Sequence, residues 1–227
     1  MLQKQKTTSL FYNKYLYKLR LRNPIGAIFR GMNLSYAKQK LDEMQRQAES
    51  ELPIKSPFRV WRGEKENISL ETFMDNCIIF TALESNKEKA SVRCEGQKLD
   101  IYSNESSWLL KIAEKIGALE FHEPATDSIA DFLSNNAINT VVTDKENDWP
   151  YKAFLAKQVD RRFSDFCKQN NKHIKIGSKA LEAVEKHQWT QGFYFRCKTE
   201  KYLMLAKIAA GTGITKVIKY VSEDELA

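Results

Sequence analysis

Cysteine and histidine are scarce in this sequence, and the few that occur are scattered. The 227 residues include four cysteines and three histidines, with no CxxC or HxxxH pair. A structural zinc site needs about four such ligands at short spacing, so neither a zinc site nor a disulfide framework is predicted. The cysteines are expected to be reduced thiols in a cytoplasmic protein.

Glycine, proline and long apolar runs are also few. Nine glycines and five prolines exclude a collagen-like or low-complexity chain. No apolar run reaches about 18 residues, so no membrane-spanning helix is expected, and the N-terminal segment lacks the pattern of a signal peptide. Walker A, GxGxxG, GxSxG and HExxH motifs are absent, so the sequence predicts no catalytic residue, no cofactor and no bound metal.

Charge, by contrast, is abundant, and it is divided into blocks. Residues 1–62 carry a net charge of +9, residues 99–149 a net charge of −7, and residues 150–220 a net charge of +10. The whole chain has a net charge of +7. Because clustered positive charge attracts polyanions, each basic block is a candidate for binding nucleic acid.

Hydrophobic periodicity predicts both helices and strands before residue 144. Helices are expected at 34–50, at 70–74 after a Ser69 cap, at 105–116 and at 127–135, with Gly117 ending the third of these. Strands are expected at 15–22, 58–62, 78–83, 119–123 and 138–143, and a hairpin over 90–103. This order is typical of an α+β protein.

A polar segment that ends in proline, residues 144–150, is predicted to link two domains, because the net charge changes sign there. The N-terminal α+β domain would cover residues 1–147, basic over 1–62 and acidic over 99–147. The C-terminal domain would cover residues 148–227 and is predicted to be ferredoxin-like. Its strands are expected at 151–157, 172–176, 192–198 and 214–221, and its helices at 159–170, 179–187 and 200–210.

The fold class follows from the order of these elements. The strand–helix–strand units at 98–123 and 192–221 have the same arrangement, which indicates an architectural repeat. Strand–helix units with additional strands predict two ferredoxin-like modules in tandem, each an open-faced sheet with helices on one side. The uncovered face of each sheet would then be available to a ligand.

Basic and aromatic residues form the candidate site, most of them on these uncovered faces and two, Arg161 and Arg162, at the start of the helix expected at 159–170. Strands 15–22 and 192–198 direct their basic and aromatic residues away from their apolar residues, where cations neutralise phosphates and rings stack on bases. Protection of a sheet edge against aggregation is the structural alternative for each strand. The predicted nucleic-acid-binding residues are Lys18, Arg20, Arg22, Arg59, Trp61, Arg62, Arg161, Arg162, Tyr194, Arg196 and Lys198.

The octamer at 191–198 is similar to the octamer of the RNA-recognition motif, which runs basic, Gly, aromatic, small, aromatic, aliphatic. It departs from that pattern at three positions, and the family's register would bury the guanidinium of Arg196. The opposite register buries Phe193 and Phe195 and exposes Tyr194 and Arg196. The chain is therefore not assigned to that family, although a basic, aromatic face is expected in either register.

Three functional hypotheses remain open. The first is a protein that binds single-stranded RNA or DNA without catalytic activity, and without contact with a membrane. The second is a structural or accessory subunit of a larger assembly, for example a viral one, whose basic ends meet either the acidic middle of another copy, so that the chain self-associates, or an acidic surface of a different protein. The third is an endoribonuclease of the tandem ferredoxin-like kind that processes CRISPR RNA, with His122 beside Glu123 as an acid–base pair.

Overall fold

The computed structural model describes residues 2–58, 65–136 and 139–226. The chain divides into two compact units, Met1–Thr7 with Lys14–Ala125 and Thr8–Asn13 with Thr126–Ala227. Each unit has a five-stranded sheet with helices on one side, so the prediction of two tandem ferredoxin-like modules is confirmed. Within the described ranges, no helix is both long enough and apolar enough to cross a membrane.

The first unit has the sheet order β1-β5-β2-β4-β3. Without β1, this is the antiparallel order of a ferredoxin-like sheet, in which the first strand pairs with the third and the fourth. Its strands are β1 (Gln3–Thr7), β2 (Tyr17–Arg22), β3 (Ala90–Glu95), β4 (Lys98–Ser103) and β5 (Glu120–Pro124), and its helices are the 3-10 helix η1 (Gly26–Met32), α1 (Leu34–Glu49), α2 (Leu70–Ser85) and α3 (Ser106–Ile116).

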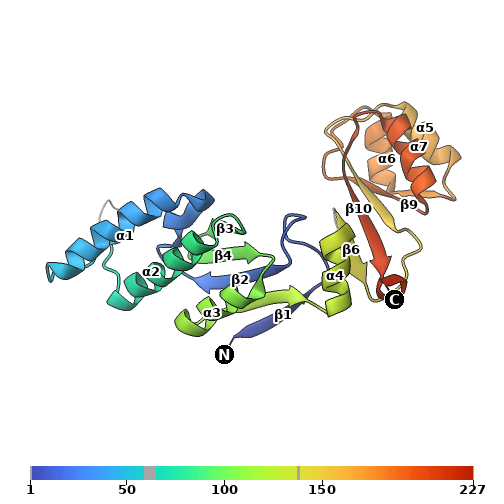
Figure 1. Cartoon of the computed structure of the whole chain (residues 1–227). Coiled ribbons are helices and arrows are strands. Elements are labelled where there is room, and N and C mark those ends of the chain that lie inside the picture. The colour runs from blue at the N-terminus through green and yellow to red at the C-terminus, as the bar shows by residue number, and fades with distance from the viewer. Residues whose placement is uncertain (1, 59–64, 137–138, 227) are drawn as a thin grey trace. The chain divides into compact units, whose positions relative to one another are not determined.

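The second unit has the sheet order β6-β10-β7-β9-β8. Figure 1 shows α5, α6 and α7 grouped on one side of β9, which leaves the other face of the sheet uncovered by helices. The strands are β6 (Thr140–Thr143), β7 (Tyr151–Leu155), β8 (Ile174–Ile176), β9 (Tyr194–Cys197) and β10 (Ile214–Ser222), and the helices are α4 (Asp127–Asn136), α5 (Arg162–Gln169), α6 (Ser178–Glu185), α7 (Glu200–Ala210) and the 3-10 helix η2 (Glu223–Leu226).

The two units repeat one topology. In each, the first strand described, β1 or β6, lies at an edge and runs parallel to the last strand, β5 or β10. The segments predicted to be a repeat are β4-α3-β5 and β9-α7-β10, and they occupy equivalent places in the two sheets. The units differ between their second and third ferredoxin-like strands, where a tight hairpin joins β3 to β4 but α6 lies between β8 and β9.

Strand alternation places one set of side chains in each core. Leu19 and Leu21 of β2 are buried against the helices of the first unit, together with Phe121 of β5. In the second unit Phe195 of β9 is fully buried, and its ring centroid lies 5.0 Å from that of Phe163 in α5. The intervening residues of these strands therefore lie on the face that the helices leave open, called the open face below.

The apolar run 78–83, predicted to be a strand after a short helix, is instead part of the single helix α2. The Ser69 hydroxyl caps this helix, as predicted, and accepts a hydrogen bond from the Thr72 amide at 3.1 Å. Ile79 and Leu83 are buried together one turn apart. Periodicity alone cannot distinguish a short buried strand from part of a buried helix, because both are apolar throughout. The strand predicted at 58–62 falls largely outside the described residues.

The boundary between the units lies at Ala125–Thr126, before the linker predicted at 144–150. The reason is strand pairing: β6 pairs in parallel with β10, and Ser9 forms a bridge with Val141. Helix α4 and β6 therefore belong to the second unit, although their segment shares the negative charge of the residues before them. A change in net charge marks a change in surface chemistry here, and not a domain boundary.

Candidate nucleic-acid interface

Three cations lie directly opposite one another on the open face of the second sheet. Lys175 of β8 is the cross-strand partner of Arg196 of β9, and Arg196 is the partner of Lys152 of β7. The next strand, β10, continues the row with Ile218. Like charges directly opposite one another destabilise a sheet, so this row weakens the fold in the absence of a negative partner.

Aromatic rings form the neighbouring row. Tyr194 is paired with Phe154, and Phe154 with Lys216. The Lys152 ammonium nitrogen lies 4.1 Å from the centroid of the Tyr194 ring and 5.0 Å from that of Phe154. Tyr194 remains 42% exposed, so a ring that is already held by cations is also accessible from solvent.

Lys198 continues the line of β9 and lies over the indole of Trp149, with 5.1 Å from its nitrogen to the ring centroid. We call this surface the basic face. It comprises Trp149, Lys152, Phe154, Lys175, Tyr194, Arg196, Lys198 and Lys216. Within the residues that the structure describes, none of its five cations forms an ion pair, whereas cations on the helices of the same unit do.

The structure brings together three of the predicted residues, Tyr194, Arg196 and Lys198, on this face. Phe195 and Cys197, which alternate with them, are fully buried. The orientation predicted for this strand, with the guanidinium of Arg196 outside the core, is therefore confirmed. The role predicted for these residues in binding nucleic acid stays a prediction.

The open face of the first sheet is different, because the charges at its centre are paired. Arg20 donates hydrogen bonds to both carboxylate oxygens of Asp100, at 2.7 and 2.9 Å, and a third to Glu120 at 3.3 Å. The hydrogen bonds and charge of Asp100 raise the pKa of Arg20 well above its usual value. Burial alone would raise the pKa of Asp100, but the hydrogen bonds and charge of Arg20 lower it.

Lys18 and His122 extend this paired network. Lys18 is only 7% exposed and lies opposite His122, whose Nε2 is 2.9 Å from Glu120. Glu123, the acid–base partner suggested by the sequence, directly follows His122 in β5, so the two side chains point to opposite faces of the sheet. Glu123 binds Lys6 at 2.8 Å instead. Of the three basic residues predicted on β2, Arg22 is the one that is exposed.

Equivalent rows in the two sheets show this contrast directly. In the first sheet the row across β3, β4, β2 and β5 reads Arg93, Asp100, Arg20, Glu120, so that the charges alternate in sign. In the second sheet the row across the equivalent strands reads Lys175, Arg196, Lys152, Ile218. One topology therefore carries a charge-balanced row in one unit and an unbalanced positive row in the other.

The remaining predicted residues lie elsewhere. Arg161 and Arg162 begin α5, which packs on the helix-covered side of the second sheet, so they do not join the basic face. Arg162 binds Asp160 at 2.8 Å, and this hydrogen bond lowers the pKa of Asp160 to about 2. Asp160 therefore balances the charge of Arg162. Arg59, Trp61 and Arg62 lie outside the described residues.

The basic face also contains residues that were not predicted from the sequence, namely Lys152, Phe154, Lys175, Lys216 and Trp149. A local signal existed for the first three, because Ala153 with Leu155 and Ile174 with Ile176 mark the inward positions of β7 and β8. No such signal existed for Lys216. An irregularity in the pairing of β10 between Ile214 and Lys216 shifts the alternation at that point.

Potential metal ligands and thiols are present among the residues that the structure describes. Within the described ranges, no group of three or more His, Cys, Asp or Glu side chains could hold a metal ion. Burial raises the pKa of Cys167 and of Cys197 to about 12, so both remain thiols at neutral pH and are poor nucleophiles.

We expect the paired network to make the first unit sensitive to mild acid. Burial lowers the pKa of His122 below its usual 6.5. As the pH falls through about 6.5, the unfolded chain takes up a proton that the folded chain resists, so stability falls. The stabilisation from Asp100 and Glu120, whose pKa values lie below 3.8 and 4.5, is lost only at lower pH.

The measurement is the thermal unfolding of the full chain at pH 7.5 and pH 5.5. The melting temperature of the wild type is expected to fall more than that of His122→Gln, which cannot be protonated. Equal decreases in the two proteins would show that His122 does not make this contribution.

No family model matches the chain, and neither a curated protein nor a solved structure does. Of the two open sheet faces, the basic face is the one on which three cations lie opposite one another on successive strands. In the first sheet Arg22 lies opposite Lys98, but Glu95 is the next residue in that row.

Proposed function

We propose that this protein binds single-stranded nucleic acid through the basic face of its second unit, without catalysing a reaction. The observation that carries the proposal is the row Lys175, Arg196 and Lys152. The mutual repulsion in this row is relieved when phosphates lie among its cations, since each phosphate brings the negative charge that the sheet itself lacks. Binding would then stabilise the second unit, because the repulsion among these cations is reduced.

The aromatic residues favour a single strand over a duplex. Tyr194 and Phe154 lie in the row next to the cations, with ring centroids 6.1 Å apart. Unpaired bases can stack on such rings, at about 1–3 kcal/mol per base, while the phosphates of the same strand contact the neighbouring cations. In a duplex the faces of the bases are already stacked on one another and cannot make this contact.

The state of the cysteines suits an intracellular role. All four are free thiols, and Cys167 and Cys197 are buried in the core of the second unit. Unpaired cysteines of this kind are typical of proteins in a reducing compartment. We therefore place the binding activity in the cytoplasm.

Binding should depend steeply on salt. Each phosphate neutralised on a single strand contributes about −0.7 to the slope of log affinity against log salt, so five cations give a slope of roughly −3.5. Affinity for a fluorescent 12-nucleotide single strand is expected to fall about 100-fold between 50 and 200 mM salt, as measured by fluorescence anisotropy. The duplex of the same sequence should bind more weakly at each salt concentration.

Two results would contradict the proposal. One is the absence of binding to any RNA or DNA strand at 50 mM salt, and the other is an affinity that does not change with salt. Sedimentation of the nucleic-acid-free protein as a salt-sensitive oligomer, combined with either result, would favour the assembly subunit instead.

A further inference from the structure

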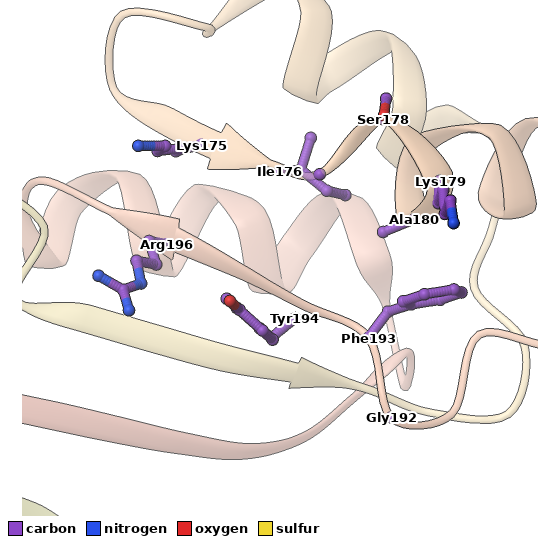
Figure 2. A pocket seen from close by; sticks show the side chains of 10 residues that line it. Lys175, Ile176, Ser178, Lys179, Ala180, Gly192, Phe193, Tyr194 and Arg196 are labelled. Atoms are coloured by element: carbon purple, nitrogen blue, oxygen red, sulfur yellow. The ribbon is translucent and has the colours of Figure 1, made fainter.

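A pocket of about 620 Å³ opens at one end of the basic face. It lies where β8 leads into α6 and where the chain turns at Gly192 to enter β9 (Figure 2). Lys175 and Arg196 of the basic face line one part of it, and Lys179 of α6 lines another. Tyr194 and Phe193 contribute aromatic surface. Among the described residues that line the pocket, none is acidic.

The position of the pocket marks where a bound strand would end. β8 is the last strand on its side of the sheet, and Lys175 is therefore the last cation of the row. A strand that lies across the basic face from β10 towards β8 reaches the pocket at that edge. The pocket volume falls within the range of about 300–1,000 Å³ that is usual for sites of small ligands, which gives room for one nucleotide.

The charge around the pocket favours a doubly charged group. Three cations line the pocket, with Lys175 and Arg196 on one side of it and Lys179 on the other (Figure 2). Figure 2 shows the side chains of Lys175 and Arg196 directed to the same side of their two strands. An internal phosphodiester has one negative charge, but a terminal phosphate monoester has about −1.5 to −2 at pH 7. The monoester therefore matches this cluster better.

We infer that the pocket binds the phosphorylated end of a single strand. The terminal phosphate lies between Lys179 on one side of the pocket and Lys175 and Arg196 on the other, and the nucleotide that carries it packs against the ring of Tyr194. This inference rests on the proposed function, because it assigns the pocket to the end of the strand that the basic face binds.

The test compares three oligonucleotides of one sequence, one with a 5′-phosphate, one with a 3′-phosphate and one with hydroxyl groups at both ends. One of the two phosphorylated strands is expected to bind about tenfold more tightly than the hydroxyl-ended strand, the effect of charge-assisted hydrogen bonds to the phosphate. Which of them binds more tightly tells the direction in which the strand crosses the sheet.

Three variants locate the effect. Lys179→Ala and Lys179→Gln are each expected to bring the three oligonucleotides to the same affinity. Lys216→Ala, on the far strand β10, should weaken all three by the same factor and keep the preference. Lys207→Ala, exposed on α7 and away from both pocket and face, should change nothing.

The outcomes separate this inference from the proposed function. Equal affinity of the wild type for all three oligonucleotides would overturn the pocket assignment while strand binding stands. A preference that persists in both Lys179 variants would overturn it as well. If no oligonucleotide binds, the proposed function itself fails.

Discussion

Replacing Arg20 by alanine is expected to destabilise the first unit by about 2–4 kcal/mol, although Arg20 lies on a sheet face that no helix covers. The reason is Asp100, whose side chain is only 8% exposed and which receives two hydrogen bonds from Arg20. Without the guanidinium, a buried carboxylate loses its main partner. The range is set below that of a fully buried pair because the Arg20 side chain is 24% exposed.

The measurement must report on one unit at a time, because a chain of two units need not unfold in one step. Amide hydrogen exchange in increasing urea, followed by mass spectrometry, reads peptides from β2 and β4 separately from those of β7 and β9. The midpoint of unfolding is expected to fall for the first pair of peptides and to stay unchanged for the second.

Two further variants show whether the ion pair is responsible. Arg22→Ala removes an exposed cation from the same strand and the same face, and should change stability by less than about 0.5 kcal/mol. Arg20→Met combined with Asp100→Leu removes both charges and should recover much of the loss, since the buried carboxylate is gone and Glu120 keeps its contact with His122. The argument is wrong if Arg20→Ala is no worse than Arg22→Ala.

The difference between the two faces explains what could be predicted from the sequence. Elements with strong periodicity or clear caps are predicted closely: α1 begins after the Asn33 cap, and α3 ends at Gly117 in a left-handed conformation, with φ +68°. These signals are local, because a cap and its helix lie within a few residues of each other. The ferredoxin-like core of each unit follows from the order of such elements, whereas the parallel pairing of β6 with β10, which sets the boundary between the units, does not.

The chemistry of the faces is less predictable, because the partners are distant in the sequence. Asp100 and Glu120, which bind Arg20, lie 80 and 100 residues further along the chain. The net charge of a block cannot show that part of the acidic middle neutralises part of the basic N-terminus. In the second unit the net charge of a block likewise cannot show which cations lie together. Lys152, Lys175 and Arg196 are far apart in the sequence, and only the strand register places them side by side.

The repeated topology therefore supplies its own comparison. Both sheets offer the same row of positions on the open face, and the first fills it with alternating charges that satisfy one another. Introducing alternating charges into the row of the second sheet should therefore both weaken binding of the single strand and stabilise the second unit. A row that evolved only to protect a sheet edge would show no link between the two effects.

Arg196→Glu makes this conversion, because it places a carboxylate between Lys175 and Lys152. Opposite charges across a strand pair contribute about 0.2–1 kcal/mol each, so the second unit should become more stable, as read from its peptides in urea. Affinity for the single strand should fall about 100-fold at 50 mM salt. Arg196 itself is lost, and the new carboxylate pairs with Lys175 and Lys152, so only two of the five cations still neutralise phosphates. The slope of log affinity against log salt should therefore change to roughly −1.4.

Arg161→Glu is the matched control. It makes the same change in net charge on an exposed residue of the same unit, but at the start of α5 rather than on the open face. Its affinity should stay within about threefold of the wild type, since exposed charges beyond a Debye length of roughly 10 Å are largely screened. If the two variants weaken binding equally, net charge and not the row attracts the strand. If Arg196→Glu binds as tightly as the wild type, the basic face is not the interface. A measured gain in stability of Arg196→Glu would exclude unfolding as the cause of a loss of affinity.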